Sequence, residues 1–372
     1  MLYKNAIAFS VAIAMAFTVG CSSSSPNNND DTQTQTEIST TSGNDIKVPA
    51  GSSVTNDNVT IINGADMSVP PTDTEKITIS LGLLNGPESL SVAHLLENSQ
   101  KGVSYEKYTY NNYNSVKDVV DALENNKVDA ATLPLNEAAK LYNKTEHRFK
   151  LAMINSLFNY CIAQNSQNIS DVSQLAGKTI AVANDDEIGK IVIDKIIKDY
   201  DIKDCKITTV DDTATLVSSV ADGSVSLALL QQPYISEASA KNASVSMAID
   251  LYDTWFEHND ADIVTGCLVV SNDFIIRNNK AFVYFMKDYD ASVTITKKNL
   301  DESSQLAAKY KLASSAASAK ASIPGASITN KTDNDMMTCA NEFFNFVNSV
   351  NPEAIGGIVP DASFYYINSN QQ

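Results

Sequence analysis

The chain has 372 residues, of which 43% are hydrophobic, and its 27 basic and 44 acidic residues give a formal net charge of −17 at pH 7. Such an acidic balance disfavours nucleic acid as a partner, because the phosphate backbone would repel it. The length and the apolar share are sufficient for a folded region of two domains.

The N-terminus has the pattern of an export signal. An apolar run of about fifteen residues follows Lys4 and ends at Gly20, which is too short to cross a bilayer but suits the hydrophobic region of a signal peptide. The segment from Thr18 to Cys21 resembles a bacterial lipobox, although Thr18 stands where Leu is usual. We therefore expect residues 1–20 to be a lipoprotein signal peptide and Cys21 to carry the lipid, with an ordinary secretory signal as the alternative.

Residues 21–75 are polar and acidic and contain almost no aromatic side chains. Such a segment cannot bury enough apolar surface to offset the entropy lost on ordering. We predict a disordered tether, in which only the short run NVTIING could form a strand.

From residue 76 onward, short β-type runs alternate with amphipathic helical patterns, and the series occurs twice. The first series is KITISLG (76–82), PESLSVAHLLE (87–97), VSYEKYTY (103–110), SVKDVVDALENN (115–126) and VDAATLP (128–134), and the second is KTIAVAN (178–184), EIGKIVIDKIIKDY (187–200), CKITTV (205–210), TATLVSSVADG (213–223) and SVSLALLQQP (224–233). Each series ends with a buried strand and a proline that opens the next helix. The pattern predicts an α/β fold of two similar lobes, each with a mainly parallel sheet.

The segments between and after the two series predict how the lobes are connected. Residues 151–165 contain two apolar runs typical of strands, and residues 261–274 contain a strand that would return the chain to the first lobe. Helices are expected near 272–298 and 333–349. We expect residues 76–160 and 262–372 to form lobe 1 and residues 161–261 to form lobe 2, joined by two hinge segments.

Ligands of open α/β sheets bind beyond the carboxyl ends of the strands, where loops lead into helices. Four such loops are expected to converge on one cleft. Together with Trp255, a tryptophan near the return crossover, the candidate ligand-binding residues are Asn85, Gly86, Pro87, Glu88, Ser89, Thr132, Leu133, Pro134, Asn136, Asn184, Asp185, Gln231 and Gln232.

The loop Asn85–Ser89 combines features of a helix start. Gly86 allows a tight or left-handed backbone, Pro87 suits the first helical position, and Ser89 can help to cap the helix. Free N–H groups at a helix start favour anions, but Glu88 in this turn and Asp185 in its counterpart would repel them. We expect a neutral or cationic ligand, unless these carboxylates only cap helices and face water. Trp255 could stack on the ligand or be a core anchor.

The sequence contains no recognisable catalytic motif, and its three histidines, His94, His147 and His258, are far apart. We expect no catalytic residue, cofactor or metal site. Apart from Cys21, the cysteines are widely spaced in apolar stretches, so they could pair in three ways or remain buried thiols, which their surroundings favour. They are Cys161, Cys205, Cys267 and Cys339.

Three stretches, AATLPLNEAAKLYNKTE, TGCLVVSNDFIIRNNKAFVYFMKDYDASV and NPEAIGGIVPDASFYYI, together resemble a known family. They are similar to substrate-binding lipoproteins of clostridial ABC importers, within the group that binds nitrate, sulfonates, taurine and thiamine pyrimidines. The resemblance implies a type II periplasmic-binding-protein fold of two Rossmann-like lobes. The family's LPEP-like turn has Gln231 and Gln232 here, so a carboxylate is missing.

The resemblance implies a solute-binding lipoprotein, anchored outside the cytoplasmic membrane by the lipid on Cys21. Its expected partners are a small-molecule solute and an ABC permease with its ATPase, and the chain is expected to be a monomer. The alternatives are a surface sensor or adhesin on the same fold and a pyrimidine-synthesising enzyme relative.

Overall fold

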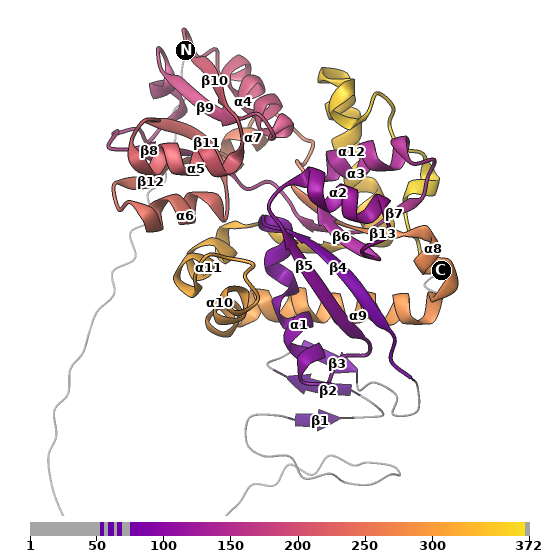
Figure 1. Cartoon of the computed structure of the whole chain (residues 1–372). Coiled ribbons are helices and arrows are strands. Elements are labelled where there is room, and N and C mark those ends of the chain that lie inside the picture. The colour runs from indigo at the N-terminus through magenta and orange to yellow at the C-terminus, as the bar shows by residue number, and fades with distance from the viewer. Residues whose placement is uncertain (1–52, 56–58, 63–64, 69–74, 369–372) are drawn as a thin grey trace, which may run out of the picture. The chain divides into compact units, whose positions relative to one another are not determined.

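The computed structural model describes residues 53–55, 59–62, 65–68 and 75–368 (Figure 1). The expected signal peptide, the lipidation site Cys21 and most of the expected tether lie outside these residues.

Part of the segment predicted to be a disordered tether contains a small antiparallel sheet. Its three strands are β1 (Ser53–Thr55), β2 (Val59–Ile62) and β3 (Ala65–Ser68). In the sequence, Asn63 and Gly64 separate β2 from β3, and this dipeptide strongly favours a two-residue hairpin turn. Strand β2 lies within the run NVTIING, which was expected as a possible strand, whereas β1 and β3 were not expected because overall composition outweighed local signals.

The first large sheet has six strands in the order β14-β7-β13-β6-β4-β5 (Figure 1). Their bounds are β4 (Thr78–Leu84), β5 (Lys107–Tyr113), β6 (Ala130–Leu133), β7 (Phe149–Ser156), β13 (Gly266–Ser271) and β14 (Ile328–Lys331). The second sheet has five strands in the order β10-β9-β11-β8-β12. Their bounds are β8 (Tyr160–Asn165), β9 (Thr179–Ala183), β10 (Lys206–Val210), β11 (Leu227–Gln231) and β12 (Val245–Asp250).

The order of the strands confirms the repeat predicted from the sequence. In the first sheet β5, β4 and β6 are neighbours in that order, and in the second sheet β10, β9 and β11 correspond to them one by one. Each triplet is parallel. The chain passes from the first sheet to the second between β7 and β8, and it returns before β13.

The sheets are mixed, whereas the sequence pattern predicted mainly parallel ones. Strand β13 runs antiparallel to both β6 and β7, and β8 runs antiparallel to both β11 and β12. These antiparallel strands lie next to the two passages between the sheets, outside the strand–helix–strand repeats. The repeats require parallel neighbours because a helix carries the chain back before each new strand, and a direct passage imposes no such requirement.

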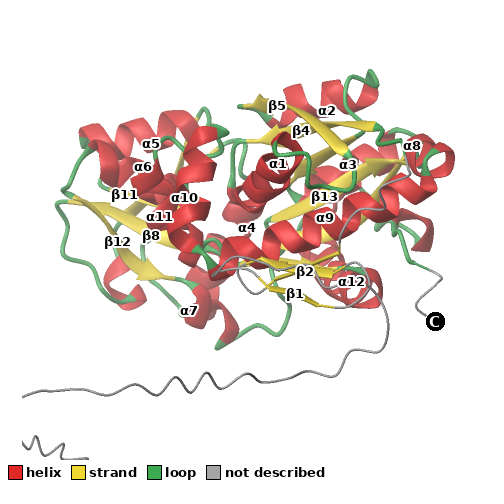
Figure 2. Cartoon of the chain, turned by 90° about the horizontal axis from the view of Figure 1, so that it is seen from below, coloured by secondary structure: helices red, strands yellow, loops and turns green. Residues whose placement is uncertain are grey.

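Helices flank both sheets (Figure 2). The helices that follow strands of the first sheet, or return to it, are η1 (Pro87–Val92), α1 (Ala93–Gln100), α2 (Val116–Glu124), α3 (Leu135–Lys144), α8 (Asn272–Arg277), α9 (Asn279–Lys298), α10 (Leu300–Lys309), α11 (Ala316–Ser322), η3 (Ile323–Gly325), α12 (Asp333–Val350), η4 (Pro352–Ile355) and η5 (Ala362–Phe364). Those of the second are η2 (Val172–Leu175), α4 (Glu187–Asp199), α5 (Thr213–Asp222), α6 (Tyr234–Lys241) and α7 (Tyr252–Phe256). No helix among the described residues is long and apolar enough to span a membrane.

Strand β4 shows how alternation builds the core. Ile79, Leu81 and Leu83 are buried in a cluster that includes residues of α1, α9 and α10. Between them, Gly82 faces Val119 of α2, which belongs to a separate cluster. Successive strand residues point to opposite faces, so both faces of β4 are covered by helices.

Candidate functional site

A cleft of about 790 Å³ is lined by residues from both large sheets. The loops that follow β4, β6, β9 and β11 all contribute to its walls. These are the carboxyl ends of the parallel strands, where open α/β sheets bind ligands. The volume falls in the range of small-molecule sites, about 300–1,000 Å³.

Eight of the sequence-predicted site residues line this cleft. They are Asn85, Gly86, Pro87, Glu88, Pro134, Asn136, Asp185 and Gln231. The four loops that were expected to converge therefore meet at one cleft. The sequence could indicate only that each loop lies at the carboxyl end of a strand.

Ser89 and Thr132 lie behind the cleft wall and support it. The Ser89 hydroxyl donates to the carbonyl of Leu84 at 2.6 Å and lies 2.7 Å from the Thr132 hydroxyl oxygen, which also accepts from the Leu84 N–H. Both side chains are completely buried. Ser89 does not cap η1 as expected, because its hydroxyl is used to tie η1 to the end of β4.

The remaining predicted residues lie outside the cleft lining. Leu133 is buried in the core. Asn184 is exposed and accepts hydrogen bonds from Lys190, and Gln232 accepts from the hydroxyl of Ser236.

Trp255 is a core anchor and lies outside the cleft. Its side chain is completely buried, and its indole N–H donates to the carbonyl of Ala261 at 2.8 Å. Its ring packs against Phe158 and Phe346. Of the two alternatives for Trp255, the structure shows the core anchor, so its place among the candidate ligand-binding residues is corrected. The acidic residues around it in the sequence gave no sign that this side chain points inward.

Glu88 is the most unusual residue of the cleft wall. It is only 2% exposed, and its Oε1 atom has no hydrogen-bond partner. Burial raises the pKa of its carboxyl to about 8, although its own backbone N–H favours the charged form. A buried carboxyl oxygen without a partner is costly, so such an atom in a cleft wall calls for a functional explanation.

Two glycines make room for this carboxyl. A Cβ at Gly86 would lie 2.5 and 2.6 Å from the two carboxyl oxygens of Glu88, and one at Gly266 would lie 2.5 Å from the Glu88 Cβ. Gly86 has an extended backbone with φ −179°, so it is needed for space and not for a left-handed conformation. This corrects the role expected for Gly86 from the sequence.

The acidic residues of the opposite wall are already engaged as caps. Asp186 accepts from the Gly189 N–H at the start of α4 and from the Tyr160 hydroxyl, both at 2.8 Å. Asp185 accepts from the N–H and the hydroxyl of Thr213. Burial raises the pKa of Asp186 to about 6, while its two hydrogen bonds act against this shift. These two carboxylates therefore cap or brace loops, unlike Glu88.

Two contacts join the walls that come from different sheets. The Tyr234 hydroxyl at the start of α6 donates to the carbonyl of Asn85 at 2.6 Å. Lys140 of α3 pairs with Glu187 of α4 at 2.5 Å and with Glu137 at 2.9 Å.

Several cleft residues escaped the sequence-based prediction. Tyr160, Tyr234, Glu237, Thr265 and a segment after α10 all line the cleft. Tyr234 directly follows the turn at Gln231–Pro233, so the position after the proline was an available signal. The segment after α10 had no such signal, since it lies more than 70 residues away from the predicted loops in the sequence.

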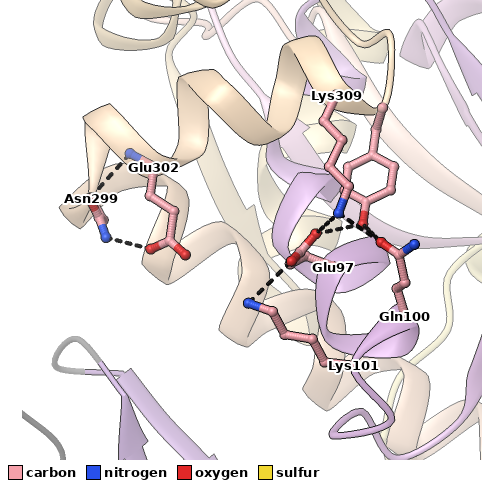
Figure 3. Close-up of polar contacts among 7 residues, drawn as sticks. Glu97, Gln100, Lys101, Asn299, Glu302 and Lys309 are labelled. Atoms are coloured by element: carbon pink, nitrogen blue, oxygen red, sulfur yellow. Dashed lines mark hydrogen bonds and ion pairs between the residues drawn. The ribbon is translucent and has the colours of Figure 1, made fainter.

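A polar cluster holds α10 against α1 (Figure 3). Lys309 pairs with Glu97 and donates to the Gln100 side chain, and the Tyr310 hydroxyl bonds to the same two residues at 2.7 and 3.0 Å. The hydrogen bond from Lys309, followed by those from Tyr310 and Lys101, lowers the pKa of Glu97 to about 2. The cluster immediately precedes the cleft-lining residues 311–314, so it positions this part of the wall.

The three histidines have separate structural surroundings. His94 is buried and lies 2.8 Å from the hydroxyl of Ser303, as expected for a helix-packing residue. His147 stacks on Tyr142, and His258 contacts the ring of Tyr200. In the described part of the chain, no group of three or more His, Cys, Asp or Glu side chains is arranged to hold a metal ion.

The cysteines of the described region are free thiols, which agrees with the interpretation favoured from the sequence. Cys161, Cys267 and Cys339 are buried, and Cys205 is half-buried.

This arrangement, with two mixed α/β sheets and a cleft at the carboxyl ends of their parallel strands, defines a type II periplasmic-binding-protein fold. Solved structures support the assignment. An ABC transporter protein from Parabacteroides distasonis has a TM-score of 0.62 at 19% identity, covering 78% of this chain and 98% of that one. The ligand-binding component of an ABC-type import system from Staphylococcus aureus, solved with zinc bound, has a TM-score of 0.62 at 13% identity, covering 79% and 97%.

A third similar structure is the alkanesulfonate-binding protein SsuA from Xanthomonas axonopodis pv. citri bound to MOPS, with a TM-score of 0.57 at 12% identity, covering 77% of this chain and 96% of that one. No curated protein sequence matches the chain. The NMT1/THI5-like family model matches residues 109–303, which is more than half of the chain, so the chain belongs to this family.

Proposed function

We propose that this protein is an extracytoplasmic solute-binding protein, which captures a small molecule in the cleft and delivers it to the permease of an ABC importer. The observation that carries the proposal is the cleft itself, which brings together loops from both sheets and the buried Glu88 side chain, whose Oε1 has no hydrogen-bond partner. The similar structures named above include ligand-binding components of ABC importers, and their fold agrees with this role.

The proposed mechanism is closure of two lobes around the solute without a chemical step. Lobe 1 would comprise residues 76–160 and 262–372, and lobe 2 residues 161–261. Tyr234 and Lys140, which make the contacts between the two walls, would stabilise the closed form. The chain would act as a monomer, since the cleft is complete within one copy.

We further propose that the mature protein is anchored to the outer face of the cytoplasmic membrane by a lipid on Cys21. The support is the apolar signal, the lipobox-like segment ending at Cys21, and the polar residues that follow it. Metabolic labelling with a fatty-acid analogue tests this anchor. The full chain should take up the label, and Cys21→Ala should lose it and be released from cells.

The binding function is tested by a thermal-shift screen of the purified full chain with pyrimidines, sulfonates, amines and amino acids. A solute that binds only the folded protein raises its melting temperature by mass action. Mass spectrometry of compounds that copurify with the chain provides an independent measurement. If no small solute stabilises the chain and none copurifies, the proposed function is wrong.

A further inference from the structure

The cleft wall contains hydrogen-bonding atoms that the protein itself leaves without a partner. Among the described residues that line it, buried side-chain oxygens without a partner occur on Asn85 and Glu88. The Asn85 oxygen is an acceptor, the Glu88 oxygen is an acceptor when the carboxyl is ionised, and both belong to the loop after β4. A solute that satisfies them must donate hydrogen bonds.

The charge of the cleft lining also favours a solute that donates hydrogen bonds. Of the described cleft-lining residues, seven are acidic and two are lysines. The acids are Glu88, Glu137, Asp185, Asp186, Glu187, Asp212 and Glu237, and the lysines are Lys241 and Lys311. An anionic solute would be repelled by this set, whereas a cation would be attracted.

Most of these acids already have partners in the protein. Asp185 and Asp186 receive hydrogen bonds at helix starts, Asp212 caps α5, and Lys140 pairs with both Glu137 and Glu187. Glu88 differs, because its Oε1 has no partner and its side chain is held in place by packing.

The surroundings of Glu88 hold its backbone in place and leave room for its side chain. The Asn155 side-chain amide donates to the Glu88 carbonyl at 2.9 Å and to the Tyr289 hydroxyl at 2.9 Å. Gly86 and Gly266 leave the space that the side chain fills. A preorganised acceptor of this kind gains strength from the low dielectric of a buried site.

From these contacts we infer that Glu88 binds a protonated nitrogen of the solute, an ammonium or amidinium group, by a charge-assisted hydrogen bond from that nitrogen to Oε1. The inference rests on the proposed solute-binding function and specifies the class of solute. Tyr160 and Tyr234, which also line the cleft, supply aromatic rings of the kind that attract organic cations. Glu88 would select for cations, because a protonated nitrogen beside the carboxyl favours its ionised form, whereas an anion disfavours that form.

The inference is tested by capture of solutes from a mixture. The purified full chain is incubated with a protein-free small-molecule extract of bacterial cells, supplemented with agmatine and spermidine, and retained compounds are identified by mass spectrometry. Glu88→Gln keeps the shape of the side chain but cannot form a carboxylate when a cation binds. Glu106→Gln is the matched control, because Glu106 is also buried but lies outside the cleft.

We expect the wild-type chain and Glu106→Gln to retain compounds with a nitrogen that is protonated at neutral pH. Glu88→Gln should retain them at least about 30-fold less, as expected when one partner of a buried charge pair is removed. Retained compounds without such a nitrogen, or a cation retained by Glu88→Gln within about threefold of the wild type, would overturn the inference while leaving solute binding intact. If the wild-type chain retains nothing, solute binding itself fails, and the assignment to Glu88 fails with it.

A second variant keeps the inference testable if Glu88→Gln does not fold. Gly86→Ala places a methyl group against the Glu88 carboxyl oxygens, while its extended backbone is accessible to any residue. This variant should fold and should lose the same cations. Retention of these cations at the wild-type level by a folded Gly86→Ala would contradict the inference.

Discussion

Replacing Glu88 with Gln should change how the stability of the unliganded protein depends on pH. The carboxyl has a pKa of about 8 in the folded protein, against an ordinary value of 4.5. Because the folded chain keeps a proton that the unfolded chain releases, this group lowers the free energy of unfolding as pH rises from about 4.5 to about 8. Below about pH 4.5 the carboxyl is protonated in both the folded and the unfolded chain, so it causes no loss of stability. The glutamine of the variant does not titrate, so Glu88→Gln lacks this pH dependence.

The size of the effect follows from the same two pKa values. One group that is protonated in the folded state and ionised in the unfolded state costs about 1.4 kcal/mol per pH unit. Between about pH 5 and about pH 7.5, wild type should lose roughly 3 kcal/mol relative to Glu88→Gln. Near pH 5, Glu88→Gln should be less stable than the wild type by about 1 kcal/mol, since the amide N–H groups of the new side chain would be buried without partners.

Urea unfolding of both proteins across this pH range, followed by circular dichroism and by the fluorescence of Trp255, measures the difference directly. Tyr234, Tyr289 and Cys267 interact electrostatically with Glu88, and burial raises the pKa of each, so all three stay neutral over the range. Groups such as Asp186 titrate in both proteins, and their contribution cancels in the difference.

Glu97→Gln is the control for this measurement. The pKa of Glu97 is lowered to about 2, so its contribution to stability is present above pH 4.5 and is lost only as pH falls toward 2. The difference between wild type and Glu97→Gln should therefore stay constant between about pH 5 and about pH 7.5. The reasoning about Glu88 is refuted if wild type and Glu88→Gln show parallel stability curves over the same range.

Three further predictions follow from the packing. Gly266→Ala should lower the free energy of unfolding by about 1–3 kcal/mol in urea, because the new methyl group meets the Cβ and the backbone of Glu88; an unchanged midpoint would contradict this crowding. Trp255→Ala should lower the free energy of unfolding by about 3–5 kcal/mol. A variant that keeps its stability but loses solute binding would show that Trp255 contacts the solute and is not a core anchor. Iodoacetamide should label neither Cys161 nor Cys267 in the folded protein, since burial raises both thiol pKa values, and rapid labelling detected by mass spectrometry would show that these sites open.

Several features of the fold were predictable because they depend on local periodicity. The alternation of apolar residues in Thr78–Leu84 and in its counterpart Thr179–Ala183 indicated strands, and the helical repeats between them indicated parallel triplets. The direction of β13 was not predictable, because it depends on how the chain passes between the sheets. In the small sheet at residues 53–68, only β2 was anticipated, and its two partner strands were missed because composition dominated the interpretation of that segment.

The candidate site also has some features that the sequence predicts and others that depend on tertiary structure. Sequence alone determined that loops such as Asn85–Ser89 would lie at the carboxyl ends of strands, since strand–loop–helix order depends only on local patterns. It could not show that Glu88 is buried, that Asp186 caps a helix, or that Trp255 belongs to the core. Those outcomes depend on residues distant in the sequence, such as Gly266, which leaves space for the Glu88 side chain. Tertiary structure alone decides which of several acidic side chains is buried with an oxygen that has no partner, because burial depends on packing between distant segments.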